Sequence, residues 1–222
     1  MLLVKQFYFN ELRECTYILS DDTKESIIVD PGMSSPRECE RIEKYIADNS
    51  LTLKKIVLTH GHFDHVMGSA WVRDKYNIPT YIHKADKGIL QHAKQTCAMF
   101  GINIEEPPTD TIDLIPEDFV TFGETKLQVI STPGHTWGSV CLYSPQDNIC
   151  LSGDTLFAGN CGRTDLPEGD NEMMCNSLTK ILAQRIKPEC EIYAGHGPKS
   201  SMSEELAHNP YLKTNTWIGF ID

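Results

Sequence analysis

The segment THGHFDH, from Thr59 to His65, places four candidate metal ligands within six positions: His60, His62, Asp64 and His65. Imidazole and carboxylate groups are the ligands that zinc, iron and manganese accept in proteins. One isolated histidine in a loop is more often a plain surface residue. Three histidines beside an aspartate, however, would leave buried polar groups without evident partners if no cation were bound. The segment therefore predicts a metal site.

Three further residues of the same types follow apolar, strand-like runs: His135 in STPGHT, Asp154 in LSGDT and His196 in YAGHG. Each comes directly after a glycine. Loops at the ends of strands commonly carry functional side chains, and they can converge on one edge of a sheet. A carboxylate such as Asp154 can bridge two cations, so seven ligands would suit two metals that share a hydroxide.

The elements that must position these ligands fall into a repeating order. The first 30 residues predict short antiparallel strands, a helix follows from Pro36 to Asn49, and the apolar strand KKIVLT leads directly into the histidine segment. A second β-rich stretch, from about Val120 to Gly153, precedes a helix over Asn171–Ile186 and a last strand, EIYAG. This order suggests two sheets packed face to face with helices outside, in one domain over residues 1–222.

Composition excludes several classes of function. The net charge of −11 and the pI of about 5.1 oppose binding to polyanions, so a nucleic-acid partner is not expected. The N-terminal residues do not follow a signal-peptide pattern, and no apolar run reaches the length of about 18 residues that predicts a membrane span. The eight cysteines form no CxxC pair, which favours a reduced, cytoplasmic protein without a membrane partner.

The motif HGHFDH, with the later PGHT, SGDT and AGHG, resembles the metallo-β-lactamase superfamily, and in particular its glyoxalase II-like (hydroxyacylglutathione hydrolase-like) branch. The resemblance extends from Val29 to Pro198. It implies the four-layer αββα sandwich and a short form that lacks the C-terminal helical domain of full-length glyoxalase II. It also implies two ligand sets bridged by Asp154, with His60, His62 and His135 on the first metal and Asp64, His65 and His196 on the second.

The segment GNCGRTD, around Arg163, is similar to segments of both glyoxalase II relatives and persulfide dioxygenases. Arg163 could bind a substrate carboxylate, because a guanidinium group makes forked hydrogen bonds to carboxylates. The alternative is a local ion pair with Asp165 that orders the loop. Cys161 is expected to be a buried, inert thiol.

The first functional hypothesis is therefore hydrolysis of a small-molecule thioester, such as a hydroxyacyl-glutathione, by a metal-bridging hydroxide. Two divalent metal ions are expected, zinc first, with iron or manganese as alternatives, and Asp64 and Asp154 are the expected catalytic residues. A thiolate leaves readily because its pKa is near ~8.5, whereas an amide nitrogen needs a proton. The ligand set thus favours a thioester over an amide.

Two other hypotheses remain open. A persulfide dioxygenase would use one iron, held by His60 or His62 together with His135 and Asp154. A metal-binding protein without turnover is the third hypothesis, and the complete set of seven ligands disfavours it. The sequence does not predict the oligomeric state.

Overall fold

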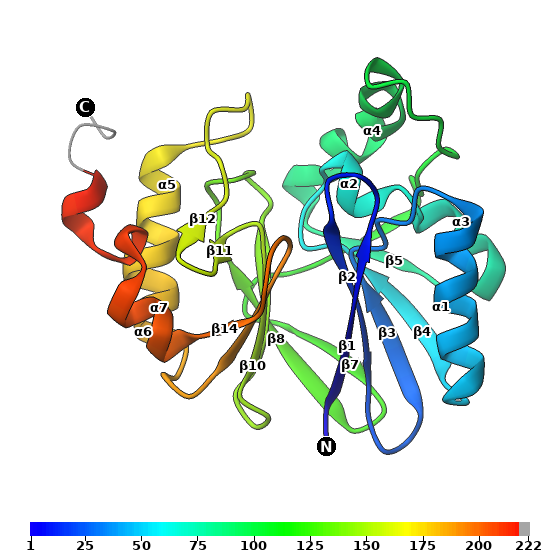
Figure 1. The fold of residues 1–222 in the computed structure, drawn as a ribbon, viewed down its shortest axis with the longest axis horizontal. Helices are drawn as coiled ribbons and strands as arrows, with labels where there is room; N and C mark the ends of the chain where they lie inside the picture. The colour runs from blue at the N-terminus through cyan, green and yellow to red at the C-terminus, as the bar shows by residue number, and fades with distance from the viewer. Residues whose placement is uncertain (218–222) are drawn as a thin grey trace. The chain divides into compact units, whose positions relative to one another are not determined.

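The first sheet contains six strands in the order in which they follow one another along the chain (Figure 1). They are β1 (Leu3–Phe9), β2 (Glu14–Ser20), β3 (Glu25–Val29), β4 (Thr52–Val57), β5 (Thr80–Ile82) and β6 (Thr111–Asp113). The first three strands pair antiparallel, as predicted, while β3, β4, β5 and β6 run parallel. Parallel strands need covering helices, and the chain supplies them between these strands.

The helices that follow these strands are α1 (Pro36–Asp48), α2 (Phe63–Val66), α3 (Ser69–Tyr76), η1 (Lys84–Asp86) and α4 (Lys87–Met99). Helix α1 begins with a proline, whose fixed φ suits the first turn, and it buries Ile42 and Ile46 on one face. Both side chains join a core with Ile28 and Ile56 of the sheet, and Leu90 of α4 packs into the same core. Helices α2 and α3 are separated at Gly68, whose N–H donates to the carbonyl of Pro31.

The second sheet also contains six strands, in the order β14-β13-β10-β9-β8-β7. Their bounds are β7 (Phe119–Phe122), β8 (Thr125–Ser131), β9 (Val140–Ser144), β10 (Ile149–Gly153), β13 (Glu191–Ala194) and β14 (Ser200–Ser201). Two short strands, β11 (Leu156–Phe157) and β12 (Asn160–Cys161), form a separate hairpin. Strands β8 and β10 are both antiparallel to β9, and β10 is parallel to β13, so β8, β10 and β13 share one direction.

The helix predicted over Asn171–Ile186 is present as α5 (Asn171–Asn176), the π-helical η2 (Ser177–Leu182) and α6 (Ala183–Arg185). The Asp170 side chain caps its start by accepting a hydrogen bond from the N–H of Met173. Helix α7 (Met202–His208) and the 3-10 turns η3 (Pro210–Leu212) and η4 (Thr214–Trp217) complete the described chain. Met174, Leu178 and Met202 pack into one core with the second sheet.

The computed structural model describes residues 1–217, and contacts divide the chain into two units. Unit 1 is Met1–Leu114 with Thr121–Lys126, and unit 2 is Ile115–Val120 with the chain from Leu127 onward. Two sheets, each flanked by helices, confirm the predicted α/β class. The single domain over residues 1–222 stays a prediction. Among the described residues, every helix is too short or too polar to cross a membrane.

Candidate metal centre

Asp30 fixes the histidine segment at one edge of the first sheet. Because β3 and β4 run parallel, Asp30 and Thr59, which follow them, lie at the same edge. The Asp30 carboxylate accepts hydrogen bonds from the Thr59 N–H at 2.7 Å and from the Thr59 hydroxyl at 2.6 Å. Asp30 itself has φ +49°, a left-handed conformation that aspartate tolerates better than most residues. The loop backbone is therefore fixed directly before His60.

His65 and His60 are both oriented through their Nδ1 atoms. His65 is fully buried, and its Nδ1 lies 3.1 Å from Asp30 Oδ2, so this nitrogen donates and Nε2 keeps its lone pair. The Thr59 hydroxyl gives its proton to Asp30 and therefore accepts from His60 Nδ1, at 3.1 Å. Ligating histidines in metalloproteins are commonly oriented in this way, with the second ring nitrogen bound to a protein acceptor.

His62 and Asp64 lie beside these two histidines. His62 is the residue before the first turn of α2, and its ring stands edge-on to the His60 ring with 4.9 Å between centroids. Asp64 Oδ2 lies 3.7 Å from His65 Nε2, and the Asp64 side chain is only 10% exposed. Unit 1 thus brings together all four ligands that the THGHFDH segment predicts, and we call this group the first half-site.

The other three predicted ligands lie together in unit 2, and we call this group the second half-site. Strands β8, β10 and β13 share one direction, so the loops that follow them, which carry His135, Asp154 and His196, emerge at one edge of the second sheet. Asp154 Oδ2 lies 3.5 Å from His135 Nε2 and 3.7 Å from His196 Nε2. One carboxylate therefore faces two imidazoles, each through the nitrogen that ligates metals most often in such sites.

Two glycines allow the close packing around His135. Its Nδ1 lies 2.7 Å from the carbonyl oxygen of Arg163, which leaves Nε2 with a lone pair toward Asp154. A Cβ atom at Gly162 would lie 1.9 Å from the Asp154 carbonyl oxygen, and one at Gly134, where φ is +143°, would lie 2.4 Å from Met174 Cα. Any side chain at these positions would displace the backbone that carries the ligands.

Three buried acidic residues near the histidine segment were missed at the sequence level. Asp30 follows β3 directly, as the predicted ligands follow their strands, and this position was the available signal. Glu14 is fully buried, and burial raises the pKa of its carboxyl group well above the usual value; its Oε1 lies 3.9 Å from His65 Nδ1. Asp86 accepts a hydrogen bond from the Gly61 N–H at 2.9 Å. The spacing of Glu14 and Asp86 in the sequence gives no signal of these roles.

Arg163 forms the local ion pair that was one of its two predicted roles. Its Nε and Nη2 atoms donate to the Asp165 carboxylate at 2.6 and 2.8 Å, and both side chains are well exposed. These bonds lower the pKa of Asp165 to about 2. Cys161 is half-buried, and burial raises its thiol pKa to about 12, which agrees with an inert thiol. A pocket of about 350 Å³ in unit 2 is lined by Cys161, Arg163, Tyr211 and Trp217, and Gly162 borders it.

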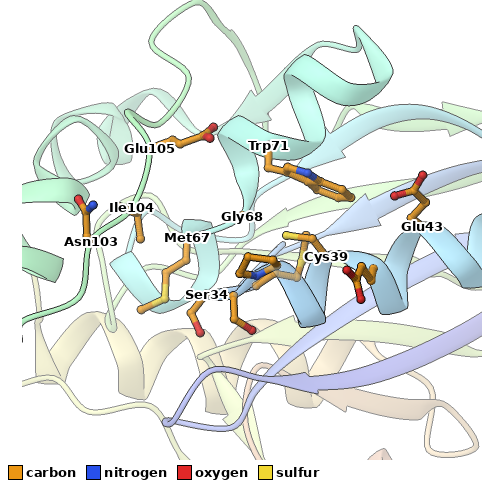
Figure 2. Close-up of a pocket in the computed structure, with 13 residues that line it drawn as sticks. Ser34, Cys39, Glu43, Met67, Gly68, Trp71, Asn103, Ile104 and Glu105 are labelled. Atoms are coloured by element: carbon orange, nitrogen blue, oxygen red, sulfur yellow. The ribbon is translucent and has the colours of Figure 1, made fainter.

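Unit 1 contains a pocket of about 350 Å³ between α1, α3 and the segment 103–105, shown in Figure 2. Met67, Trp71 and Cys39 form its apolar part, and Glu43 and Glu105 bring carboxylates to its edge. Glu43 is paired with Lys75 at 2.7 Å. None of the residues given for the lining of this pocket is a predicted ligand, so the pocket adds no metal ligand to the first half-site.

A family profile and two curated relatives match most of the chain. The profile of the metallo-beta-lactamase superfamily matches residues 12–196. A probable metallo-hydrolase, YqgX, from Bacillus subtilis is 34% identical over 198 residues, which are 88% of this chain and 90% of that protein. The hydroxyacylglutathione hydrolase GloC from Haemophilus influenzae is 30% identical over 202 residues, 90% of this chain and 92% of that protein.

Two solved structures are also similar throughout. The B3 metallo-beta-lactamase BLEG-1 aligns with a TM-score of 0.84 and 32% identity, over 95% of this chain and 100% of that one. TTHA1623, solved in a di-iron-bound form, aligns with a TM-score of 0.84 and 32% identity, over 94% of this chain and 100% of that one.

Proposed function

Because the chain belongs to the metallo-β-lactamase superfamily, we propose that it is a dinuclear metal-dependent hydrolase that cleaves thioesters, similar to glyoxalase II. Membership of this superfamily indicates a metallo-hydrolase. The relative named as a hydroxyacylglutathione hydrolase supports a thioester of glutathione as the substrate. We assign the ligands in two sets bridged by Asp154: His60, His62 and His135 for the first metal, and Asp64, His65 and His196 for the second.

The observation that carries this proposal is the position of Asp154. Its Oδ2 atom lies 3.5 Å from His135 Nε2 and 3.7 Å from His196 Nε2, and the two histidines are assigned to different metals. A carboxylate between two imidazoles is suited to bridge two cations. The donor set also fits divalent transition metals, because hydrogen bonds at Nδ1 of His60, His65 and His135 place the acceptor lone pair of each ring on Nε2.

Two metals at this site would supply water whose pKa is lowered from about 16 toward about 7 and would polarise the thioester carbonyl. The residues of the chain hold and orient the ligands: Asp30 sets His65, Thr59 sets His60, and the Arg163 carbonyl sets His135. A thiolate leaving group has a pKa near ~8.5, so the reaction needs no strong general acid. Zinc is our first assignment, and the di-iron form of a similar protein supports iron as the alternative.

Arg163 is proposed to bind a carboxylate of the thiol part of the substrate. Two of its N–H groups bind Asp165, and a guanidinium carries five, so donors remain for a second acceptor. Its backbone carbonyl accepts a hydrogen bond from His135 Nδ1, so the backbone of Arg163 lies next to a proposed ligand.

One experiment tests the function directly. The protein is purified without added metal, its zinc, iron and manganese are quantified, and hydrolysis of S-lactoylglutathione is measured beside oxygen consumption with glutathione persulfide. We expect close to two metal ions per chain, thioester hydrolysis and no oxygen uptake. A stoichiometry of one that persists under metal supplementation, or oxygen uptake without hydrolysis, would overturn the proposal.

The variant Asp64→Asn separates the two reactions further. Asp64 is assigned to the second metal, which a single-iron dioxygenase does not need. We expect the variant to bind the first metal and to lose about 10²-fold in kcat for the thioester, because the second metal is weakened. If instead the wild type has no thioesterase activity and the variant keeps the oxygen uptake of the wild type, the protein is a dioxygenase.

A further inference from the structure

Trp137 is the most exposed tryptophan of the described chain. Its exposed fraction is 56%, whereas Trp217 is 4% exposed and Trp71 is half-buried against α1 and Tyr76. An indole ring buries a large apolar area when it finds a partner, so tryptophan is enriched where proteins bind other molecules. One exposed apolar residue is ordinary by itself. The exposure of Trp137 is relevant because this residue lies close to a proposed ligand in the sequence.

Trp137 lies two residues after the proposed ligand His135, in a loop closed by hydrogen bonds. The Thr132 N–H donates to the Ser139 carbonyl at 2.9 Å, and the Thr136 N–H donates to the Ser139 hydroxyl at 3.1 Å. Cα atoms two residues apart are separated by at most about 7 Å. The backbone of Trp137 therefore lies close to that of His135, in a loop whose two ends are held by hydrogen bonds.

A second exposed apolar side chain is attached to the same loop. Met173, in the first turn of α5, is 42% exposed. The residue before that helix, Asp170, donates its N–H to the Gly134 carbonyl at 2.8 Å. Helix α5 is thereby anchored one residue before His135. Methionine is flexible and polarizable, so it adapts to apolar groups of different shapes.

We propose that Trp137, extended by Met173, binds the acyl group of the substrate and makes the enzyme prefer bulky apolar or aromatic acyl thioesters over lactoyl thioesters. This specificity rests on the proposed thioester hydrolysis. Arg163 and Trp137 would bind different parts of the substrate. Arg163, whose carbonyl accepts a hydrogen bond from His135, carries the positive charge that suits a carboxylate of the thiol part. The loop of Trp137 offers apolar surface, which suits the part of the substrate beyond the scissile carbonyl.

The test compares S-mandeloylglutathione with S-lactoylglutathione in the wild type, Trp137→Ala and Trp137→Phe. We expect the wild type to prefer the mandeloyl substrate in kcat/KM, and Trp137→Ala to lower kcat/KM for that substrate about tenfold or more. The lactoyl substrate should change less than about twofold, because its methyl group contacts little of the indole. Trp137→Phe should restore most of the preference. Leu206→Ala, at another exposed apolar residue of unit 2, is the matched control and should leave both substrates unchanged.

Binding without turnover provides the second measurement. Titration of the metal-loaded protein with S-hexylglutathione, a thioether that cannot be hydrolysed, should shift the tryptophan emission of the wild type to shorter wavelength but not that of Trp137→Phe. An equal loss of kcat/KM for both thioesters in Trp137→Ala overturns the inference. An emission shift in Trp137→Phe as large as that of the wild type overturns it too. A wild type that hydrolyses neither thioester overturns the proposed function instead, and the fluorescence titration then still tests whether Trp137 contacts the apolar group.

Discussion

Asp30 is the residue on which the geometry of the first half-site depends. Its carboxylate accepts from the Thr59 N–H, the Thr59 hydroxyl and His65 Nδ1, so one side chain sets the loop and one proposed ligand directly. Through the Thr59 hydroxyl it also sets His60. A residue that orients ligands in this way can affect metal affinity as strongly as a ligand does.

We therefore expect Asp30→Asn to weaken metal binding by about 10- to 100-fold, because an amide offers one acceptor oxygen where the carboxylate offers two. Competition with a chelator of known affinity measures the change. Asp48→Asn is the matched control, since Asp48 pairs with Lys44 on the exposed face of α1, away from the proposed ligands. Equal affinities for wild type and Asp30→Asn would show that the Asp30 bonds are structural only.

Arg163→Ala should raise KM for glutathione thioesters far more than for a neutral thioester, since only the former loses a charge-assisted hydrogen bond of about 1.5–3 kcal/mol. Steady-state kinetics with both substrates measure the difference. Asp165→Asn serves as the control, because it removes the ion pair but keeps the guanidinium. Equal effects of Arg163→Ala on the two substrates would assign the arginine to loop structure.

Residue types and spacing predict that the four candidate ligands of the THGHFDH segment lie near one another, and their role as metal ligands stays a prediction. His60, His62, Asp64 and His65 lie together because they occupy one short loop and the turn that follows it. The supporting roles of Asp30 and Glu14 were not predicted, because they depend on which strands pair, and pairing is a tertiary property. The Arg163–Asp165 pair was predicted as an alternative because residues two apart can meet in a loop, where a helix would keep them apart.

At the scale of elements, the sequence predicts the long strands and helices well and the short ones poorly. Strands β6, β11, β12 and β14 have two or three residues, too few for any periodicity to be visible. Helix α7 ends at His208, and its start carries a capping box in which Ser201 and Glu204 bond each other's backbone N–H groups. The π-helical turn within the helix from Asn171 to Arg185 leaves no mark in the hydrophobic pattern.

Asp21 joins the end of β2 to the tip of the β7–β8 hairpin, and its replacement should destabilise unit 1. The Asp21 carboxylate accepts from the N–H groups of Glu124 and Thr125 at 2.8 and 3.1 Å and from the Thr125 hydroxyl at 3.0 Å. We expect Asp21→Asn to lower the free energy of unfolding by about 1–3 kcal/mol, measured by urea denaturation. Asp22→Asn, at an exposed residue that pairs with the N-terminal amine, should change little.

The effect of Asp21 should also depend on pH. Burial alone would raise the pKa of this carboxyl group, but hydrogen bonds from Thr23, Glu124 and Thr125 outweigh burial and lower it. A lowered pKa in the folded state means that the stabilisation is present above the unfolded pKa, near ~3.9, and is lost as the pH falls through the lower folded value. The wild type and Asp21→Asn should therefore converge in stability below about pH 4. A difference that stays constant down to pH 3 would contradict this account.

At the scale of the whole molecule, all eight cysteines lie within the described residues, and none of them forms a disulfide there. We expect eight reactive thiols per chain in denaturant without reductant, and no change of Tm when reductant is added. In the native protein, reaction should be slow even at the partly buried Cys39 and Cys161, because burial raises their pKa values to about 11 and about 12. Fewer than eight thiols in the denatured protein would reveal a disulfide.

The division of the chain into units has a consequence for its synthesis. Residues Thr121–Lys126 belong to unit 1, although the chain has by then already contributed Ile115–Val120 to unit 2. Domains commonly fold in order as the ribosome releases them. Here a nascent chain that has emerged only as far as Leu114 still leaves the Asp21 carboxylate without Glu124 and Thr125. Unit 1 must therefore wait for part of the following sequence before it is complete, although its own sheet ends with β6 at Asp113. A gene fragment cut at that apparent boundary would encode an unfinished unit.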